Sequence, residues 1–374
     1  MRKFLSYLML MAVVAASCSK NEVTTPDRRV PVFFNPPVIG QATKGYIEST
    51  EYPTTAEFHI WGYFTDAADV NPASAGDHGQ EYLAGERCTY MQIDGAGPKY
   101  WLPHYTYDTD KTGYYYWKSG IGYITFQALS PYGLSGVSHD WVTGLAIDDF
   151  TIDETVASQK DILYTNYTSP QRNPYDETAG DLGPDKGVDI CFKHALSAVR
   201  FQFRELKDYA TEESSTIKIK KIELLNAYSN ADFAENRATS ALNTYSSSPA
   251  WTNINSEHDY VIYENATGVT LTWVAGEAVI TDVLGNVFMS IPQNLDHSSE
   301  GLRQVSVRIT YTINDGENNT VAASLAGLKA GITPIDSWEM GKRYTYVITV
   351  GLNKILFDPV ITDWLTTADN YIMF

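Results

Sequence analysis

Positive charge is scarce in this chain. Its 374 residues include 27 Lys and Arg against 45 Asp and Glu, which gives a formal net charge of -18 and a pI near 4.7. Nucleic-acid binding needs basic faces, so this balance argues against a nucleic-acid partner. The excess of acid is the ordinary mark of a soluble exported protein.

Helical periodicity is also lacking, because no stretch keeps a 3.6-residue apolar repeat over three turns. Aromatic residues are plentiful instead, with 26 Tyr, 8 Trp and 14 Phe, whereas charged residues make up only 19%. Aromatic and β-branched residues favour strands. The length suits about two domains of roughly 150 residues each. The composition therefore predicts an all-β protein with short helices at most.

Catalytic and metal-binding patterns are missing as well. The seven histidines are scattered, with no i, i+4 pair and no nearby thiol pattern. No G-x-S-x-G elbow and no glycine-rich phosphate loop occurs. His194 continues the alternation of Ile190 and Phe192, a pattern typical of a hydrogen-bonded core histidine rather than of a ligand. Carboxylates cluster at 148–154 and 176–189, which solvated loops explain. We therefore predict no enzyme, no cofactor and no metal.

No apolar run is long enough to span a membrane as a folded helix. The longest, Phe4 to Ala16, follows Arg2 and Lys3 and precedes Ala-Ala-Ser-Cys18, which resembles a bacterial lipobox. We expect residues 1–17 to be a signal peptide, Cys18 to carry lipid in the outer membrane, and residues 18–29 to form a tether. The alternative is an ordinary secretory peptide with an incidental cysteine.

Two cysteines remain besides Cys18, namely Cys88 and Cys191. An oxidising compartment would allow them to pair. Two separate buried thiols explain them equally well, because nothing in their spacing requires contact.

Alternating apolar residues predict strands along most of the chain. The clearest run is 305–313, which ends at the turn Asn314-Asp315-Gly316, and a second is 344–352 near the C-terminus. A phase reversal at 195–198 requires a turn or bulge, and a phase slip at Lys220-Lys221 predicts a bulge. The Ser, Asn and Ala-rich stretch 229–258 predicts a long loop excursion.

Several short segments resemble one family. They are W-x-x-G-x-x-Y-x-Y-x-I from Trp338, L-N-K-I-x-F-x-P-V-x-x-x-W from Leu352, D-I-L-Y at 161–164, F-K-H-A-L-S-A-V-R-F at 192–201, and I-P-Q at 291–293. In this order they are similar to the fimbrillin-like proteins of Bacteroides-type bacteria, the lipoprotein pilins of the type V pilus.

The resemblance implies a fold and a function. The fold would be two tandem transthyretin-like β-sandwich domains, at residues 30–195 and 196–374. The chain would be a structural subunit of a surface pilus that supports adhesion and assembles by strand exchange with other pilin subunits. In the family a trypsin-like protease removes the first strand, here the one that carries Phe33 and Phe34. The family position matches Lys44, where the family has arginine.

Arg29 is a second basic residue beside that strand, but a cut after it would leave the strand in place. At the other end of the chain, the polar stretch 366–370 precedes Tyr371, Ile372, Met373 and Phe374. An apolar terminus needs a partner surface. We expect this tail, alone or with strand 355–364, to act as the donor strand that enters the next subunit.

A different function class stays open at this point. The aromatic belt from Tyr90 to Trp117 could stack on sugar faces, and the protein would then be a glycan-binding or adhesive surface lipoprotein with a host or bacterial ligand that never polymerises. A hydrolase is a third and weaker alternative.

Replacing Cys18 tests the lipobox. We expect Cys18→Ala to leave an uncleaved or unacylated precursor, because the thiol is the acceptor of the lipid. Palmitate labelling in cells reports the result, and normal labelling of the variant would show that Cys18 is not the lipidated residue.

Overall fold

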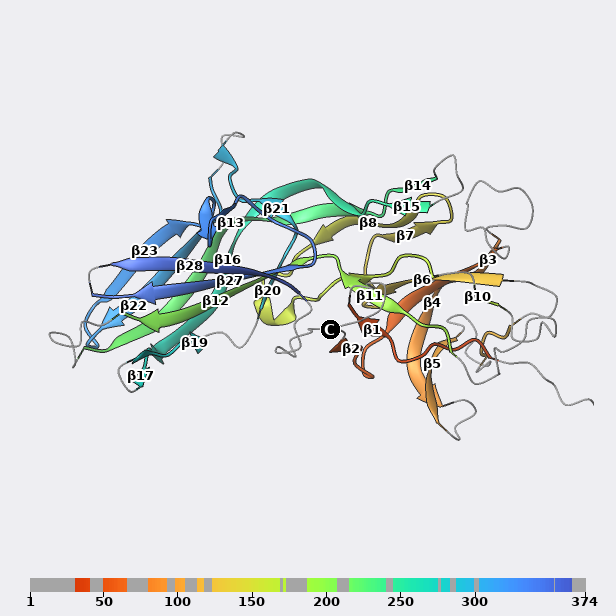
Figure 1. Cartoon of the computed structure of the whole chain (residues 1–374), viewed down its shortest axis with the longest axis horizontal. Coiled ribbons are helices and arrows are strands. Elements are labelled where there is room, and N and C mark those ends of the chain that lie inside the picture. The colour runs from red at the N-terminus through yellow and green to blue at the C-terminus, as the bar shows by residue number, and fades with distance from the viewer. Residues whose placement is uncertain are drawn as a thin grey trace, which may run out of the picture.

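β-strands dominate the described residues (Figure 1), as the alternating apolar residues of the sequence predict. The structure is a computed structural model. It describes residues 31–40, 50–65, 80–92, 98–104, 113–117, 123–168, 171–172, 187–206, 215–239, 245–274, 277–282, 287–298, 303–352 and 354–364. Within these ranges there is no α-helix, and the short 3-10 turn η2 covers Val156–Ser158. The all-β prediction is confirmed.

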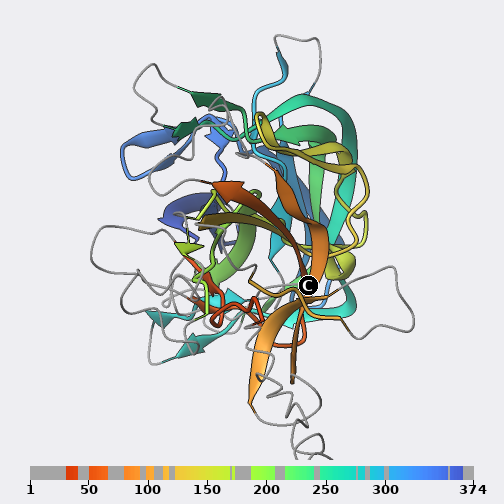
Figure 2. The same cartoon turned by 90° about the vertical axis from the view of Figure 1, so that its right-hand side faces the viewer.

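The first sheet has nine strands and curves strongly (Figure 2). β10 (Gln171–Arg172) pairs with β6 outside the main path of the sheet. Along that path the strands follow in the order β2 (Thr50–Glu51), β1 (Val38–Ile39), β11 (Cys191–His194), β9 (Leu163–Tyr164), β6 (Tyr123–Ser130), β3 (Phe58–Thr65), β4 (Glu81–Gln92) and β5 (Lys99–His104).

Two further sheets form the other body of the molecule. The six-stranded sheet runs β23 (Asn318–Ser324), β22 (Ser306–Ile313), β13 (Ile217–Ala234), β8 (Gly144–Thr151) and β7 (Val137–Asp140), and β16 (Ala250–Thr270) also pairs with β13. The five-stranded sheet runs β19 (Thr281–Asp282), β12 (Ser197–Glu205), β27 (Lys342–Val350) and β28 (Ile355–Asp363), with β20 (Phe288–Ser290) on β12.

Four two-stranded ribbons complete the described strands. They are β14 (Arg237–Thr239) with β15 (Tyr245–Ser247), β17 (Trp273–Val274) with β18 (Glu277–Ala278), β21 (Gln293–Asn294) with β26 (Ser337–Trp338), and β24 (Leu328–Ala330) with β25 (Thr333–Ile335).

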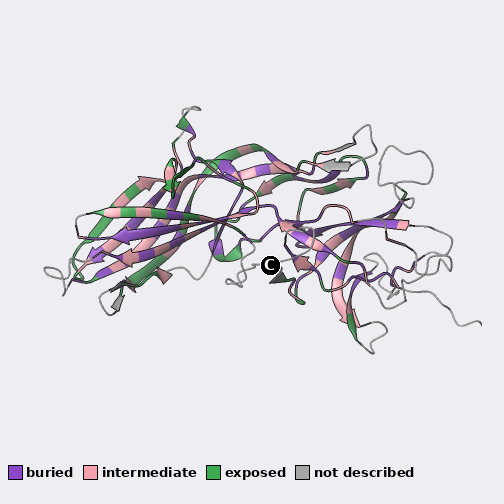
Figure 3. Cartoon of the chain, in the orientation of Figure 1, coloured by how far each residue is buried: buried purple, intermediate pink, exposed green. Residues whose placement is uncertain are grey.

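The long hairpin of β13 and β16 joins the two bodies. Its strands cover 217–234 and 250–270, so the predicted loop excursion over 229–258 is wrong. Most of the β16 side chains face solvent (Figure 3), so the polar sequence of this strand resembles that of a loop. Where it passes Lys220, β13 shifts register against both neighbours, which confirms the predicted bulge.

The chain crosses between sheets at residues 195–196. There β11 of the first sheet ends and β12 of the five-stranded sheet begins, which confirms the predicted turn at the phase reversal. The predicted domain boundary near residue 195 stays a prediction. Strands β7 and β8 come before it in sequence, yet β8 pairs with β13, which comes after it.

Each face of the first sheet contacts a different core. Phe58 and Ile60 of β3 lie in a cluster that is confined to the first sheet and its neighbours. Trp61 and Tyr63 lie in the larger core, which continues through the long hairpin to the five-stranded sheet. This is the ordinary alternation of a strand, and the register shift against β4 at Ile60 and Trp61 is taken up by Gly85 of β4, which lies between the partners Ala84 and Glu86.

Buried polar contacts tie the two bodies together. His139 contacts the Tyr63 hydroxyl through Nδ1 at 2.8 Å and the Gln127 side-chain oxygen through Nε2 at 2.7 Å. An amide oxygen only accepts, so Nε2 carries a proton. Burial, together with the charge of Arg237, lowers the pKa of His139 to about 3, so the ring is neutral at physiological pH. Gln127 in turn donates to Glu235 at the end of β13.

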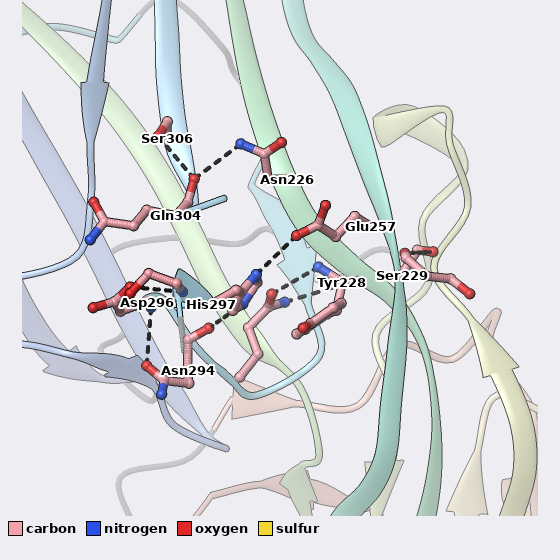
Figure 4. A network of polar contacts seen from close by, with 12 residues as sticks. Asn226, Tyr228, Ser229, Glu257, Asn294, Asp296, His297, Gln304 and Ser306 are labelled. Carbon is pink, nitrogen blue, oxygen red and sulfur yellow. Dashed lines mark hydrogen bonds and ion pairs between the residues drawn. The ribbon is translucent and has the colours of Figure 1, made fainter. Parts of the chain in front are cut away.

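A second network fixes the segment between β21 and β22 onto the long hairpin (Figure 4). The His297 ring stacks on Tyr228 with centroids 4.1 Å apart, and its nitrogens lie 3.3 Å from the Glu257 carboxylate and 2.7 Å from the Asn294 carbonyl. Gln293, from the I-P-Q segment, accepts from the backbone N–H of Tyr228 at 2.8 Å. This motif residue therefore works through backbone hydrogen bonds within the core.

Two glycines near β7 allow a matched test of packing. Both have left-handed backbone angles, but a Cβ at Gly136 would lie 2.1 Å from the Asp148 carbonyl oxygen, whereas a Cβ at Gly133 meets nothing within 4 Å. We expect Gly133→Ala to cost about 1–2 kcal/mol of stability, the usual left-handed penalty. Gly136→Ala should cost clearly more, because it also displaces β8. Denaturant unfolding measures both, and equal costs would show that Asp148 moves aside freely.

Candidate functional site

Residues 31–40, here called the seam, connect the edge strand β5 of the first sheet with the part of that sheet around β11. On one side Val32 donates to the Tyr115 carbonyl at 2.7 Å and Phe34 donates to the Trp101 carbonyl of β5 at 2.9 Å. On the other side Asn35 donates to the Val188 carbonyl at 3.0 Å, and the Val188 N–H donates back to the seam at 3.0 Å. One short segment therefore lies between β5 and the residues that lead into β11.

The second half of the seam is the short strand β1. Val38 donates to the Ile190 carbonyl at 3.1 Å and Gly40 donates to the Phe192 carbonyl at 2.8 Å. β1 runs parallel to β11, with Val38 opposite Cys191, and antiparallel to β2. Hydrogen bonds thus follow the seam along nearly its whole length, as they would for a strand inserted into a sheet.

The seam also fills the core of the first sheet. Val32, Phe34 and Ile39 are 0%, 1% and 1% exposed. The Phe34 ring meets Phe126 edge-on at 5.3 Å between centroids. Phe33 points into a small separate cluster with Leu102 and Tyr114. Burial of each large apolar side chain stabilises the fold by roughly 1.5–3 kcal/mol.

Asn35 adds the specific polar contact of the seam. Its side-chain amide donates to the Asp189 carboxylate at 2.7 Å and to the Gly187 carbonyl at 3.0 Å. A Cβ at Gly187 would lie only 2.7 Å from the Asn35 backbone nitrogen. The seam therefore packs directly against bare backbone at this point.

The predicted processing residues flank the seam but lie outside the described residues, as do Cys18 and the tail Tyr371, Ile372, Met373 and Phe374. The positions of Arg29 and Lys44 in the sequence determine what a cut after each residue would separate. Arg29 precedes the seam, whereas Lys44 falls between β1 and β2. A cut after Lys44 separates the seam from β2, and a cut after Arg29 does not.

At the C-terminal end, β28 occupies the edge of the five-stranded sheet and pairs with β27 over nine residues. The chain then reaches Trp364, whose ring stacks on His194 with centroids 3.9 Å apart and 7° between the planes. His194 also contacts the buried Asp161 carboxylate at 2.7 Å. The prediction that His194 is a hydrogen-bonded core residue is confirmed.

The structure also places the two cysteines, the possible metal ligands and the aromatic belt noted in the sequence. Cys88 and Cys191 are separate free thiols. Within the described ranges, no three His, Cys, Asp or Glu residues come close enough to hold a metal ion. In the aromatic belt Trp101, Tyr114, Tyr115 and Trp117 are all at most 8% exposed, so these rings belong to the core rather than to a sugar-stacking surface.

The sequence alone did not reveal the residues that receive the seam. Val188, Ile190 and Phe192 were visible as an alternating run, but nothing indicated that their backbone binds residues more than 150 positions away. Trp101 and Tyr115 belong to the aromatic belt, and their role as acceptors is carried by backbone carbonyls, which leave no pattern in sequence.

Comparison with known families shows to which family the chain belongs. The sequence model of the family described as fimbrillin-like matches residues 99–364, which is most of the chain. The chain belongs to the fimbrillin-like family. Among curated proteins, no sequence matches it.

A solved structure supports the fold of this fimbrillin-like chain. A fimbrial protein from Bacteroides vulgatus ATCC 8482 is similar at a TM-score of 0.52 and 16% identity, covering 88% of this chain and 99% of that one. The tip fimbrial protein Mfa3 from Porphyromonas gingivalis, with a C-terminal truncation, matches at a TM-score of 0.38 and 10% identity, covering 83% and 94%. No helix in the described ranges is long and apolar enough to cross a membrane.

Phe34 provides a test of how firmly the seam is held. We expect Phe34→Ala to lower the free energy of unfolding by about 3–5 kcal/mol, because it empties a fully buried position. Val38→Ala, at a half-buried position of the same segment, is the control and should cost much less. Chemical denaturation measures both, and similar small losses would show that the seam contributes little to the core.

Proposed function

We propose that this fimbrillin-like chain is a structural subunit of a surface pilus, in which a strand from a neighbouring subunit replaces the seam. The seam is the observation that carries the proposal. It is one short segment at the start of the described chain, it is buried, and its hydrogen bonds run to strands far away in sequence. A peptide that inserts this way can be exchanged for another of similar shape.

A proteolytic cut makes that exchange favourable. Without the seam, the carbonyls of Trp101, Val188, Ile190 and Phe192 lose the bonds that the seam makes, and Phe126 loses its ring partner. Each ladder hydrogen bond contributes a net ~0.5–1.5 kcal/mol, and leaving a buried group unsatisfied costs about 1–3 kcal/mol. The cleaved subunit therefore has a strong preference for an incoming strand.

The rest of the proposal concerns export and anchoring. The precursor would cross the inner membrane with its signal peptide and attach to the outer membrane through lipid on Cys18. Removal of residues 1–44 would then release the subunit from its lipid at the same time as it opens the groove. The donor would come from the C-terminal end, which contains β28 and the tail Tyr371 to Phe374. Its partners would be other pilin subunits, and the filament would support adhesion.

A Lys44 variant tests the processing step. We expect Lys44→Gln to keep the seam and to abolish filaments, because the protease no longer has its basic residue between β1 and β2. Arg29→Gln is the matched control and should still yield filaments whose subunits begin at Gly45. Electron microscopy and N-terminal sequencing of surface protein give both answers. Mature subunits that begin at Val30, or that retain Cys18, would overturn this activation step.

A further inference from the structure

Apolar fit alone does not fix the register of a strand that replaces the seam. Val32 and Phe34 are buried through their shape, and a strand that slides by two residues presents the same face to the core. Hydrogen bonds between backbones do not distinguish side chains either. A foreign strand with alternating apolar residues can therefore enter the groove in more than one register. Selecting one register needs a contact that only one side chain can make.

Asn35 makes such a contact in the seam. Its side-chain amide donates to the Asp189 carboxylate at 2.7 Å and to the Gly187 carbonyl at 3.0 Å. Val188 lies between these two residues. It accepts from the Asn35 N–H at 3.0 Å, and its own N–H donates to the Phe33 carbonyl at 3.0 Å. Residues 187–189, here called the clasp, thus hold one seam residue through both its main chain and its side chain.

Both side-chain contacts of Asn35 end on acceptors that belong to the groove. A carboxylate and a carbonyl oxygen cannot donate, so the clasp is complementary to a side chain with an N–H or O–H group. The approach is also close, because a Cβ at Gly187 would lie 2.7 Å from the Asn35 side-chain oxygen. When the seam leaves, the clasp stays in the chain and meets whatever side chain arrives at this position.

The charge of the clasp matters in a protein that is rich in acid. Asp and Glu number 45 against 27 Lys and Arg, so a competing segment of this protein more often brings a negative charge than a positive one. A carboxylate in the place of Asn35 would face Asp189 without a hydrogen to share, and the two charges would repel each other. An apolar side chain would leave both acceptors without a partner from the strand. The clasp therefore favours donors, then apolar residues, and disfavours carboxylates most.

We infer that Asp189, with the Gly187 carbonyl beside it, is the specificity-determining group of the groove. It selects an incoming strand that has a side-chain hydrogen-bond donor directly after the apolar residue in the place of Phe34. This inference rests on the proposed function, because it concerns the strand that replaces the seam. The partner that it identifies is an extended segment with the pattern apolar, any residue, apolar, donor, which residues 32–35 of the seam also follow.

Peptide exchange on the full chain tests this selection. A recognition site for a specific protease, placed at residues 41–44, allows the folded chain to be cut between β1 and β2. A labelled peptide of residues 30–40, in large excess, then competes with the seam, and fluorescence anisotropy measures its binding. We expect the Asn35→Asp peptide to bind at least about tenfold more weakly than the native one, as loss of a hydrogen bond to a charged group implies. The Asn35→Ala peptide should lie between them.

The partner variant Asp189→Asn separates the clasp from a general loss of fit, because an asparagine at 189 can donate to a carboxylate at 35. In that chain most of the Asn35→Asp deficit should disappear. Pro36→Asp is the matched control on the peptide. It adds the same charge at an exposed seam position that has no clasp contact, so its binding should stay within about threefold of the native peptide.

The outcomes separate the clasp from the exchange itself. Equal binding of the Asn35→Asp and native peptides, or a deficit that persists in full in Asp189→Asn, would overturn the role of Asp189 and leave the exchange standing. Failure of the native peptide to enter the cut chain would instead remove the exchange on which the proposed function rests. The uncut chain gives an independent reading, because Asn35→Asp should lower its free energy of unfolding less when Asp189→Asn is present. Equal losses in both backgrounds would also overturn the clasp.

Discussion

A strand at the edge of a sheet needs its backbone groups covered, and residues 31–40 cover the edge strand β5 while they also pair with residues 188–192. Their N–H groups reach Trp101 on one side and Val188, Ile190 and Phe192 on the other, while their side chains fill the space between. Phe34 of this segment packs against Phe58 and Phe126, so the core of the first sheet depends on it.

Much of the fold could be predicted from local pattern. The runs 305–313 and 344–352 alternate because one face of each strand is buried, and both form strands. Asn314 and Asp315 adopt left-handed angles, as the turn signal requires. The excursion over 229–258 was missed because β16 exposes most of its side chains, so its polar sequence lacks the apolar alternation on which strand prediction depends.

The site was predictable only in part. Sequence indicated that Phe33 and Phe34 belong to a special first strand, and the structure buries both. It could not indicate what receives them, because Trp101 and Val188 act through backbone atoms and lie 67 and 154 positions from Phe34. Likewise the contact of Asp161 with His194 and the stacking of Trp364 on that ring join three motifs that sequence had placed separately.

The long hairpin has a further consequence for how the molecule comes apart. β13 pairs with β22 over its first half and with β8 over its last residues, and Glu235 directly after it accepts a hydrogen bond from Gln127 of the first sheet, so this strand connects the two bodies. The larger core likewise runs without interruption from Trp61 of the first sheet to Tyr346 of the five-stranded sheet. Neither body can therefore lose its structure without removing support from the other. The described chain should unfold as one cooperative unit, and a tensile load applied to its two ends would be shared between both bodies instead of opening a hinge between them.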